Sequence, residues 1–386
     1  MLDINIIRNE TERVKAAVAR KKFAVDIDEL LSVDEQRRQL AGQIDGLRAK
    51  RKTVSGSIRA LEGEAKAEAI EQGRLLREEI SHLEDTQRQT ESRFDELMLL
   101  VPGLPVEGIP DGASDEDNLE VRRVGEIPRF NFDAKDHVEL CESLGLADFS
   151  RAAKFAGGRA YLLTGHGALL EYAVTRFAMD LLMQRGWSPM VVPLLVNDKA
   201  MFGTGFFPHG LEDTYQLPND DLYLVGTSEV SLVSIHRDEV LAAESLPIRY
   251  AGMTTCFRRE AGNYGRDTRG LYRVHQFQKV EQVSIIEANE EASEAEHYRL
   301  LDNSESILKA LGIPYRVALA CTQELGMGQA RKHEIESWMP SRQAYCETHS
   351  CSTMHDFQAR RSRIRYRPEA QAKPLFAHTL NNTAIA

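Results

Sequence analysis

The first 100 residues carry a heptad pattern that constrains the fold more tightly than any other part of the 386-residue chain, and they contain no proline, tryptophan or tyrosine. In two stretches, apolar residues recur in alternating steps of four and three, with breaks at Arg51, Gln87 and Thr90, and this is the 3.5-residue period of a coiled-coil seam. The seams cover residues 40–61 and 76–97, and a segment at 62–74 separates them. We therefore expect residues 1–100 to form two long helices paired in an antiparallel hairpin.

The charge of this hairpin is uneven. Between residues 34 and 60 there are seven basic and three acidic residues, although the whole chain has a formal net charge of −11. With such an acidic balance, any contact with nucleic acid must come from a local basic patch. Taken alone, however, a run of charge on a helix is most often a solvated face.

Composition divides the rest of the chain. Residues 101–125 contain Pro102, Pro105 and Pro110 together with several glycines, and this density breaks both helical and strand periods. We predict a linker at 101–125 and a second domain at 126–386. That domain mixes helices and strands without a Walker or G-x-G-x-x-G pattern, so any nucleotide site there belongs to another fold.

The chain shows no sign of a membrane or secretory location. No run approaches the ~20 apolar residues of a membrane span, and the N-terminus lacks a basic region followed by an apolar one. Five cysteines in a chain of this length do not form a disulfide framework, so we expect a cytoplasmic protein.

One group of potential metal ligands lies close together in the sequence. Zinc sites usually begin with a Cys-x2–4-Cys pair and a distant second pair. Here all four residues fall in one short stretch on mixed strand faces, which favours local packing over zinc: Cys346, His349, Cys351 and His355.

A helix followed by a strand is predicted early in the second domain. Residues 168–184 form an amphipathic helix, and residues 191–196 form a strand in which Pro193 indicates a sheet edge. The apolar stripe of the helix consists of Leu170, Ala173, Phe177 and Leu181.

A second strand, predicted at 272–285, has an unusual face. An ordinary half-buried strand alternates apolar with polar residues, whereas this one places cations, rings and a carboxylate in a row: Arg273, His275, Phe277, Lys279 and Glu281. At ~3.3 Å per residue, the first and last members are about 26 Å apart. That length suits contact with a polyphosphate, a base and an amino group in turn.

The preceding residues fit as the other strand of a hairpin. Arg258 and Glu260 are two apart and so share a face. The loop between the strands, at 261–271, contains glycines and Arg266 and Arg269, which suit a phosphate-rich partner. A surface hairpin held by ion pairs is the alternative, but exposed pairs add little stability and need no phenylalanine among them.

These residues resemble motif 2 of the seryl-tRNA synthetases, which are class II aminoacyl-tRNA synthetases. The resemblance rests on Phe257-Arg258-x-Glu260, the run 265–270 and the run 275–281. The helix, strand and Pro193 resemble motif 1, which forms the dimer interface of class II enzymes. The likeness covers nearly the whole chain and implies an α+β homodimer, with an antiparallel sheet flanked by helices and an N-terminal antiparallel coiled-coil arm.

The resemblance also implies the reaction. The carboxylate of L-serine attacks the α-phosphate of ATP to give seryl-adenylate and pyrophosphate, and a terminal ribose hydroxyl of serine tRNA then takes the seryl group. Selenocysteine tRNA is a further acceptor implied by the family. The arm would embrace the long variable arm of the tRNA through phosphates and sugars, at Arg48, Lys50, Arg51 and Lys52.

Carried over residue by residue, the resemblance implies an ATP site. Arg258 would hold the α-phosphate and Arg273 the γ-phosphate, both as catalytic residues, while Glu260 would bind the adenine amino group and Phe277 would stack on the base. Glu347 and Ser350 would bind Mg²⁺, an ion that prefers oxygen ligands. The remaining ATP contacts implied are Arg259, Thr348 and His349.

The implied serine site draws on three segments. The run Thr227-Ser228-Glu229 resembles the family's serine-binding loop, Glu281 would pair with the serine ammonium, and the start of motif 3 would contribute Asn381 and Thr383. In the family, motif 3 continues into a helix that bears an arginine for the γ-phosphate, whereas this sequence ends at Ala386. We expect that segment to have been omitted rather than lost, because the other motif positions are intact.

Two competing functions are weighed against this one. A non-catalytic relative would keep the arm and the dimer surface but bind RNA without aminoacylation, and the absent arginine favours it while Arg258, Phe277 and Glu281 oppose it. A ligase that charges a carrier protein is opposed by the long basic arm, since such an enzyme has no tRNA to hold.

Overall fold

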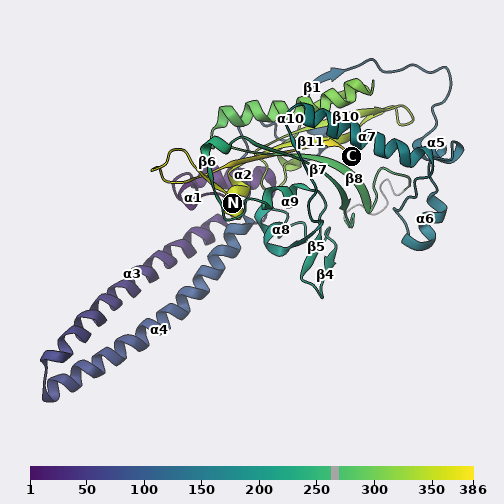
Figure 1. The fold of residues 1–386 in the computed structure, drawn as a ribbon. Helices are drawn as coiled ribbons and strands as arrows, with labels where there is room; N and C mark the ends of the chain where they lie inside the picture. Colours follow the sequence, from purple (N-terminus) through teal and green to yellow (C-terminus); the bar gives the residue numbers. More distant parts are fainter. Residues whose placement is uncertain (262–268) are drawn as a thin grey trace. The chain divides into compact units, whose positions relative to one another are not determined.

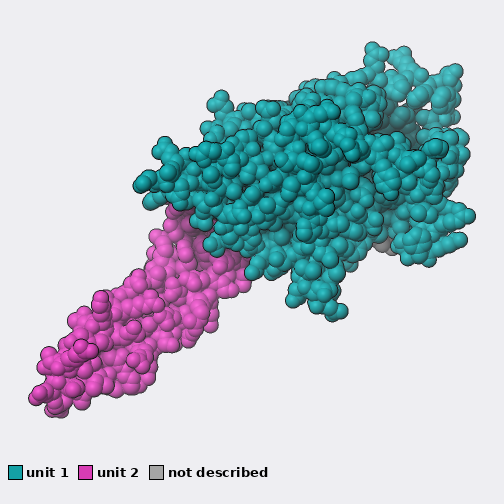
Figure 2. Space-filling view, viewed as in Figure 1, with its two compact units in different colours: residues 1, 102–386 teal, residues 2–101 magenta. Residues whose placement is uncertain are grey.

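The computed structural model describes residues 1–261 and 269–386 and divides into two units, which Figure 2 colours separately. One unit spans Leu2–Val101, and the other consists of Met1 and Pro102–Ala386. The predicted loop residues Gly265 and Arg266 lie outside the described residues.

The N-terminal unit is built from four helices, and its two long ones run antiparallel (Figure 1), as predicted. Seam residues Ile44 and Ile80 are almost completely buried. The segment at 62–74 does not separate the helices, because the second long helix already begins at Gly63. Glycine inside a helix costs only about 1 kcal/mol, and Ala69 extends the second seam backward by one heptad and is buried. The helices are α1 (Ile4–Asn9), α2 (Thr11–Lys21), α3 (Ile27–Ser57) and α4 (Gly63–Leu100).

A buried carboxylate joins α1 to α3 at the base of this hairpin. The side chain of Asp34 is 1% exposed and accepts hydrogen bonds from Arg8 Nε at 2.7 Å and from Arg37 at 3.1 Å. Burial alone would raise the pKa of Asp34, but these bonds outweigh it and hold the pKa below its ordinary value. The carboxylate therefore stays charged and fixes the short helix against the long one.

The larger unit is organised on an eight-stranded sheet in which every neighbouring pair is antiparallel except β2 and β7 at one edge. This confirms the predicted α+β class and its antiparallel sheet. Strand β1 falls within the range predicted as a linker and pairs with β9. In spatial order the strands are β1 (Leu119–Val124), β9 (Tyr315–Leu319), β10 (Arg331–Met339), β11 (Ala344–His355), β14 (His378–Ile385), β8 (Gln276–Ile286), β7 (Ile248–Phe257) and β2 (Ser188–Met190).

Both faces of the sheet are covered. Helices α7 (His166–Gln184) and α10 (Glu290–Ala310) pack on one face through a core that includes Leu182 and Leu300. On the other face, Leu232 and Val283 belong to a second core with residues of α11 and strand β12. The remaining helices are α5 (His137–Ser143), α6 (Phe149–Ala156), α8 (Asp198–Thr204), α9 (Glu229–Ser234) and α11 (Phe357–Ser362). One three-stranded sheet has the order β13 (Leu375–Phe376), β12 (Arg365–Arg367), β6 (Val240–Ala242). Another has the order β3 (Leu195–Asn197), β5 (Leu222–Leu224), β4 (Gln216–Leu217).

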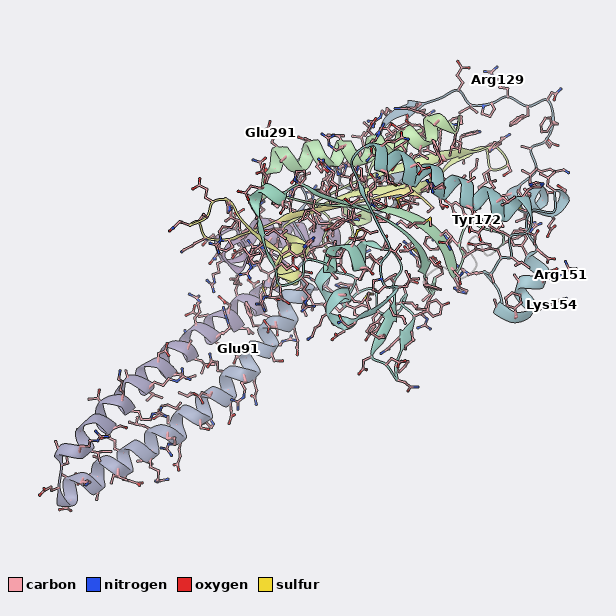
Figure 3. The ribbon with its side chains drawn as sticks, in the orientation of Figure 1. Glu91, Arg129, Arg151, Lys154, Tyr172 and Glu291 are labelled. Carbon is pink, nitrogen blue, oxygen red and sulfur yellow. The ribbon has the colours of Figure 1, made fainter. Side chains whose placement is uncertain are left out.

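The apolar stripe predicted for α7 is not the face that packs on the sheet. Ala178 and Leu182 are fully buried against the core, whereas Leu170 is 59% exposed. Of the predicted stripe, Leu181 packs against the core cluster. Tyr172, labelled in Figure 3, adds a second large exposed side chain on this helix. The helix therefore carries two apolar faces, and one of them has no partner within the described part of the chain.

The prediction of a strand over 191–196 is mostly wrong, because residues 191–194 lie in no strand and only Leu195 and Val196 do. Met190 ends β2, which pairs with β7, and Leu195 begins β3, which belongs to a different sheet. Pro193 lies between them and its carbonyl accepts a hydrogen bond from Ser231 at 2.6 Å. Proline offers no N–H for a strand ladder, so the chain changes sheets at this point.

Among the described residues, no helix combines the length and apolar character needed to cross a bilayer. All five cysteines are free thiols. Cys351 and His349, from the group weighed for zinc, are buried on β11. Over the described ranges, no three His, Cys, Asp or Glu side chains are grouped to hold a metal ion.

Candidate active site

The hairpin predicted around the unusual strand is present. Strands β7 and β8 pair antiparallel from Ile248 opposite Ile285 to Phe257 opposite Gln276. The second strand begins at Gln276 rather than at Tyr272, because the chain before it pairs elsewhere: the His275 N–H donates to the Arg159 carbonyl at 3.1 Å. The cation-bearing end of the predicted face therefore leaves the sheet.

The two faces of β8 have different partners. Val280 belongs to the core beneath α7 and α10, and Ser284 donates to Glu296 of α10 at 2.6 Å. Phe277 and Lys279, on the opposite face, line a cavity of about 1190 Å³, and Val283 on that same face enters the apolar core. One face of a single strand thus changes from polar to apolar along its length, which matches a strand that supports a site at one end and a core at the other.

The cavity brings together most of the predicted ATP residues from three segments of the chain. It is also lined by Lys279, a member of the polar strand face, and by several residues that the sequence did not place in a site, among them His137, Trp338 and Arg342. Arg259 is exposed and is not among the lining residues, and its backbone N–H donates to the Asp213 carbonyl at 2.9 Å. The predicted residues that line the cavity are Arg258, Glu260, Arg273, Phe277, Glu347, Thr348, His349, Ser350 and Thr383.

Arg258 and Phe277 form the centre of the site. The Arg258 guanidinium lies 5.2 Å from the centroid of the Phe277 ring, and its Nε donates to the Gly226 carbonyl at 3.4 Å. A cation over a ring is attracted by the ring quadrupole. The arginine is therefore held against the ring, with its other N–H groups available for a phosphate.

Glu260 and Arg273 face each other near this pair. Arg273 donates to the Glu260 carboxylate at 3.5 Å, and Arg159 contributes a second guanidinium at 4.0 Å. Glu260 has a φ of 52°, a left-handed conformation that costs a non-glycine residue energy. Its carboxylate is 9% exposed and thus fixed between two cations.

A β-bulge places two predicted Mg²⁺ ligands in the same cavity. In a regular strand, residues three apart point to opposite faces. Strands β10 and β11 shift register, so that Ser350 lies opposite Glu334, His349 opposite Ile335, and Glu347 opposite Glu336. The one extra residue in β11 re-aims the side chains before it, and both Glu347 and Ser350 line the cavity.

The surroundings of Glu347 raise the pKa of its carboxyl. The residue is exposed, yet the protein around it and the like charge of Glu334 both move this pKa upward. Lys332 forms an ion pair with Glu334 at 2.6 Å. His349 is buried, which lowers its pKa to about 4, so it is neutral at pH 7.

Two of the predicted serine-binding residues, Thr227 and Glu281, contact Lys279. Its ammonium donates to the Thr227 hydroxyl at 3.2 Å and forms an ion pair with Glu281. Thr383 lies opposite Glu281 on the neighbouring strand β14. Asn381, on the same strand, donates to Glu229 at 2.9 Å. Ser228 is the exception, because its hydroxyl donates to the Gly252 carbonyl of β7 at 3.4 Å.

Glu229 is a buried carboxylate near a second one. Burial and the charge of Glu281 raise its pKa to about 7, against hydrogen bonding from Gln358 and the charges of Lys279 and Arg258. Sequence analysis assigned no role to Gln358, which lies on α11. Its role depends on a partner 129 residues away, so no local pattern could have revealed it.

Comparison with known proteins agrees with this geometry. The model of the seryl-tRNA synthetase N-terminal domain matches residues 1–105, and the model of the class II tRNA synthetase core domain (G, H, P, S and T) matches residues 214–386. The serine–tRNA ligase of Deinococcus radiodurans is 43% identical over 386 residues, covering 100% of this chain and 91% of that protein. The serine–tRNA ligase of Geobacillus kaustophilus is 44% identical, covering 100% and 92%.

Solved structures show the same relationship. Seryl-tRNA synthetase from Pyrococcus horikoshii, complexed with ATP, superposes with a TM-score of 0.94 at 35% identity, covering 100% of this chain and 92% of that one. Cytoplasmic serine–tRNA ligase from Naegleria fowleri, in complex with AMP, gives a TM-score of 0.87 at 28% identity, covering 100% and 90%.

Proposed function

The chain belongs to the seryl-tRNA synthetase family of class II aminoacyl-tRNA synthetases and is a serine–tRNA ligase, and from this premise we propose how its residues divide the work. The observation that carries the proposal is the continuity of one strand face, on which Phe277 and Lys279 line the large cavity while Glu281, the next residue on that face, is buried. We assign the nucleotide to the cavity and the amino acid to the buried polar residues around Glu281.

ATP occupies the open cavity. Phe277 stacks on the adenine and Glu260 accepts a hydrogen bond from its amino group. Arg258 contacts the α-phosphate, where negative charge develops as the serine carboxylate oxygen attacks phosphorus and the bond to pyrophosphate breaks. Arg273 contacts the γ-phosphate. Such a reaction depends on positioning and on charge stabilisation rather than on a protein nucleophile.

Serine occupies the buried site. Lys279 carries one positive charge, and Glu229 and Glu281 together carry two negative charges when ionised. One negative charge is therefore unbalanced, and the ammonium of serine can neutralise it. The Thr227 hydroxyl already accepts from Lys279 and from the Glu229 N–H at 3.4 Å, so its own proton can be donated to the serine hydroxyl. A site that hydrogen-bonds this hydroxyl rejects analogues without it.

The residues of the bulge fit a magnesium ion. Glu347 and Ser350 offer oxygen ligands in one cavity, and the raised pKa of Glu347 identifies a carboxylate that would gain from a nearby cation. Two protein oxygens leave the remaining positions to phosphate oxygens and water. When bound, Mg²⁺ would add positive charge beside the phosphates.

The N-terminal unit would bind serine tRNA through the basic residues at 48 and 50–52. Lys50 and Lys52 are exposed on α3, whereas Arg48 is paired with Glu84 at 2.7 Å and Arg51 is half-buried in the seam. The two lysines are therefore the side chains most available to phosphates. Serine tRNA is the proposed acceptor and selenocysteine tRNA a second one.

The unpartnered face of α7 supports a homodimer. Leu170 and Tyr172 are 59% and 66% exposed, and Val191, near Pro193, is 100% exposed. Large exposed apolar side chains grouped on one element mark protein–protein contacts. A cytoplasmic location is proposed with it, in keeping with the free thiols.

The function is tested with the full-length protein in two assays. Serine-dependent exchange of pyrophosphate into ATP reports adenylate formation, and charging of serine tRNA reports transfer. A non-catalytic relative would give neither signal, and a ligase for a carrier protein would give exchange without charging. Either result would overturn the proposal.

A further inference from the structure

Gln358 is held in one orientation beneath the proposed serine site. It lies on α11, is fully buried, and uses both ends of its amide. Nε2 donates to Glu229 Oε1 at 2.7 Å and to the Thr204 carbonyl at 3.0 Å, while Oε1 accepts from the Thr379 hydroxyl at 2.7 Å. A carbonyl only accepts hydrogen bonds, so the Thr204 contact requires the NH₂ end of the amide to face Glu229.

The same oxygen of Glu229 receives a second amide donor. Asn381 Nδ2 lies 2.9 Å from Oε1. Both donors converge on Oε1, and among the described residues no hydrogen bond reaches Oε2. The nearby cation, Lys279, is engaged with Thr227 and Glu281. The carboxylate is therefore anchored by one oxygen through neutral donors.

We propose that Gln358 is a positioning residue for serine, which holds Glu229 turned so that its second carboxylate oxygen is presented to the substrate and which favours the charged form of that carboxylate. The inference rests on the proposed function of Glu229 in serine binding. It assigns a role in amino-acid recognition to a residue that touches neither serine nor ATP.

The electrostatics of the pocket give the amide this importance. The charged groups around Glu229 are Glu281, which opposes its ionisation, and Lys279 and Arg258, which favour it. The side chains that face it from α11 and β14, Gln358 and Asn381, are uncharged. Because the pKa of Glu229 is near 7, its carboxylate is only partly ionised at physiological pH, and the hydrogen bond from Gln358 increases the ionised fraction. Losing that bond moves the pKa upward.

The test compares Gln358→Met with the wild-type protein in serine-dependent pyrophosphate exchange from pH 6 to 9. Methionine keeps the length of the side chain and removes the amide. At pH 7 we expect the KM for serine to rise about tenfold, with the KM for ATP changed less than about twofold. The acid limb of kcat/KM for serine should move about one pH unit upward, so that the two proteins converge at high pH.

Gln282→Met is the matched control. Gln282 is an equally buried glutamine on the opposite face of β8, where it accepts from Asn303 at 2.6 Å. The Gln282→Met variant should have a lower melting temperature than the wild-type protein, with no shift in the pH dependence of kcat/KM for serine. If Gln358→Met lowers stability while its acid limb stays at the wild-type pH, or if the KM values for serine and ATP rise equally, the inference is wrong.

Thr379→Val provides a second variant should Gln358→Met fail to fold. It removes the hydroxyl that orients the amide and should shift the acid limb in the same direction by a smaller amount. An unshifted limb in a folded Thr379→Val protein would overturn the inference. Absence of exchange by the wild-type protein would instead reject the proposed function, which keeps the two failures distinct.

Discussion

The Lys279 ammonium and the Glu281 carboxylate form a buried ion pair two residues apart on one face of β8, with 8% and 2% of their side chains exposed. The pair is neutral as a unit. Glu229, close enough for the charge of Glu281 to raise its pKa, is therefore the excess negative charge of the pocket. The following predictions start from this arrangement.

Replacing Glu281 with glutamine should weaken serine binding more than ATP binding. The variant removes one negative charge and leaves Lys279 to pair with Glu229, which then no longer attracts the serine ammonium. We expect the KM for serine to rise at least tenfold, or about 1.4 kcal/mol, with the KM for ATP nearly unchanged. Pyrophosphate exchange at varied serine and ATP measures both, and equal losses would contradict the assignment.

Serine affinity should fall as the pH drops through 7. The pKa of Glu229 is raised to about 7, so the carboxylate becomes neutral below that pH and loses its attraction for an ammonium. The sign for stability is opposite: because the pKa is lower in the unfolded chain, this group favours the fold at acidic pH, and that contribution is lost as the pH rises through 7. Glu229→Gln should flatten the acid limb of the serine profile and remove this stability term, as followed by thermal unfolding between pH 5 and 8.

Phe277→Leu should weaken ATP binding without affecting serine. Leucine keeps the apolar contact but removes the ring under Arg258, and stacking of a base on a ring is worth about 1–3 kcal/mol. The KM for ATP should rise about tenfold or more. Isothermal titration with a non-hydrolysable ATP analogue checks this, and an unchanged affinity would show that the adenine lies elsewhere in the cavity.

Glu347→Gln should raise the Mg²⁺ concentration needed for exchange. The substitution removes one charged oxygen ligand and keeps the shape of the side chain. We expect about a tenfold shift in the half-saturating Mg²⁺ concentration, partly recovered at high Mg²⁺. Because the pKa of Glu347 is raised, protons compete with the metal, and the wild-type requirement should increase as the pH falls. A Mg²⁺ dependence identical to that of the wild type would remove Glu347 from the metal site.

Reversing the charge of Lys50 and Lys52 should separate the two half-reactions. Both side chains are exposed on α3, so their loss should not disturb the fold. Charging of serine tRNA should fall, and the salt dependence of tRNA binding should become shallower by ~0.7–0.9 in slope per lost phosphate contact. Pyrophosphate exchange, which needs no tRNA, serves as the control, and a parallel loss of exchange would indicate damage beyond the arm.

Periodicity predicted the parts of the fold that depend on local sequence. The seam positions of the two long helices and the pairing of β7 with β8 follow from repeats of 3.5 and 2 residues. The same reasoning did not identify the main packing face of α7, since the exposed Leu170 and the buried Leu182 are the same residue type. A helix with two apolar faces does not reveal which one the sheet will cover.

Site residues that share one strand could be predicted from the sequence. Those that reach the site through contacts between distant segments could not. Phe277, Lys279 and Glu281 stood out because they occupy a face that would ordinarily be apolar. Gln358 gives no such signal, because its importance arises from packing α11 against Glu229 and Thr379. Resemblance to a family supplied the remaining residues, but it could not indicate that Ser228 turns toward β7.

The bulge between β10 and β11 makes the spacing of residues as important as their identity. Between Cys351 and Glu347, one extra residue interrupts the alternation along β11, so every side chain before Thr348 has the opposite phase from the one that counting back from Cys351 would give. In a regular ladder of the same sequence, without the bulge, Glu347 would point away from the cavity although its chemical group would be unchanged. The register between β10 and β11 therefore decides which side chains of this strand reach the cavity, independently of what those side chains are.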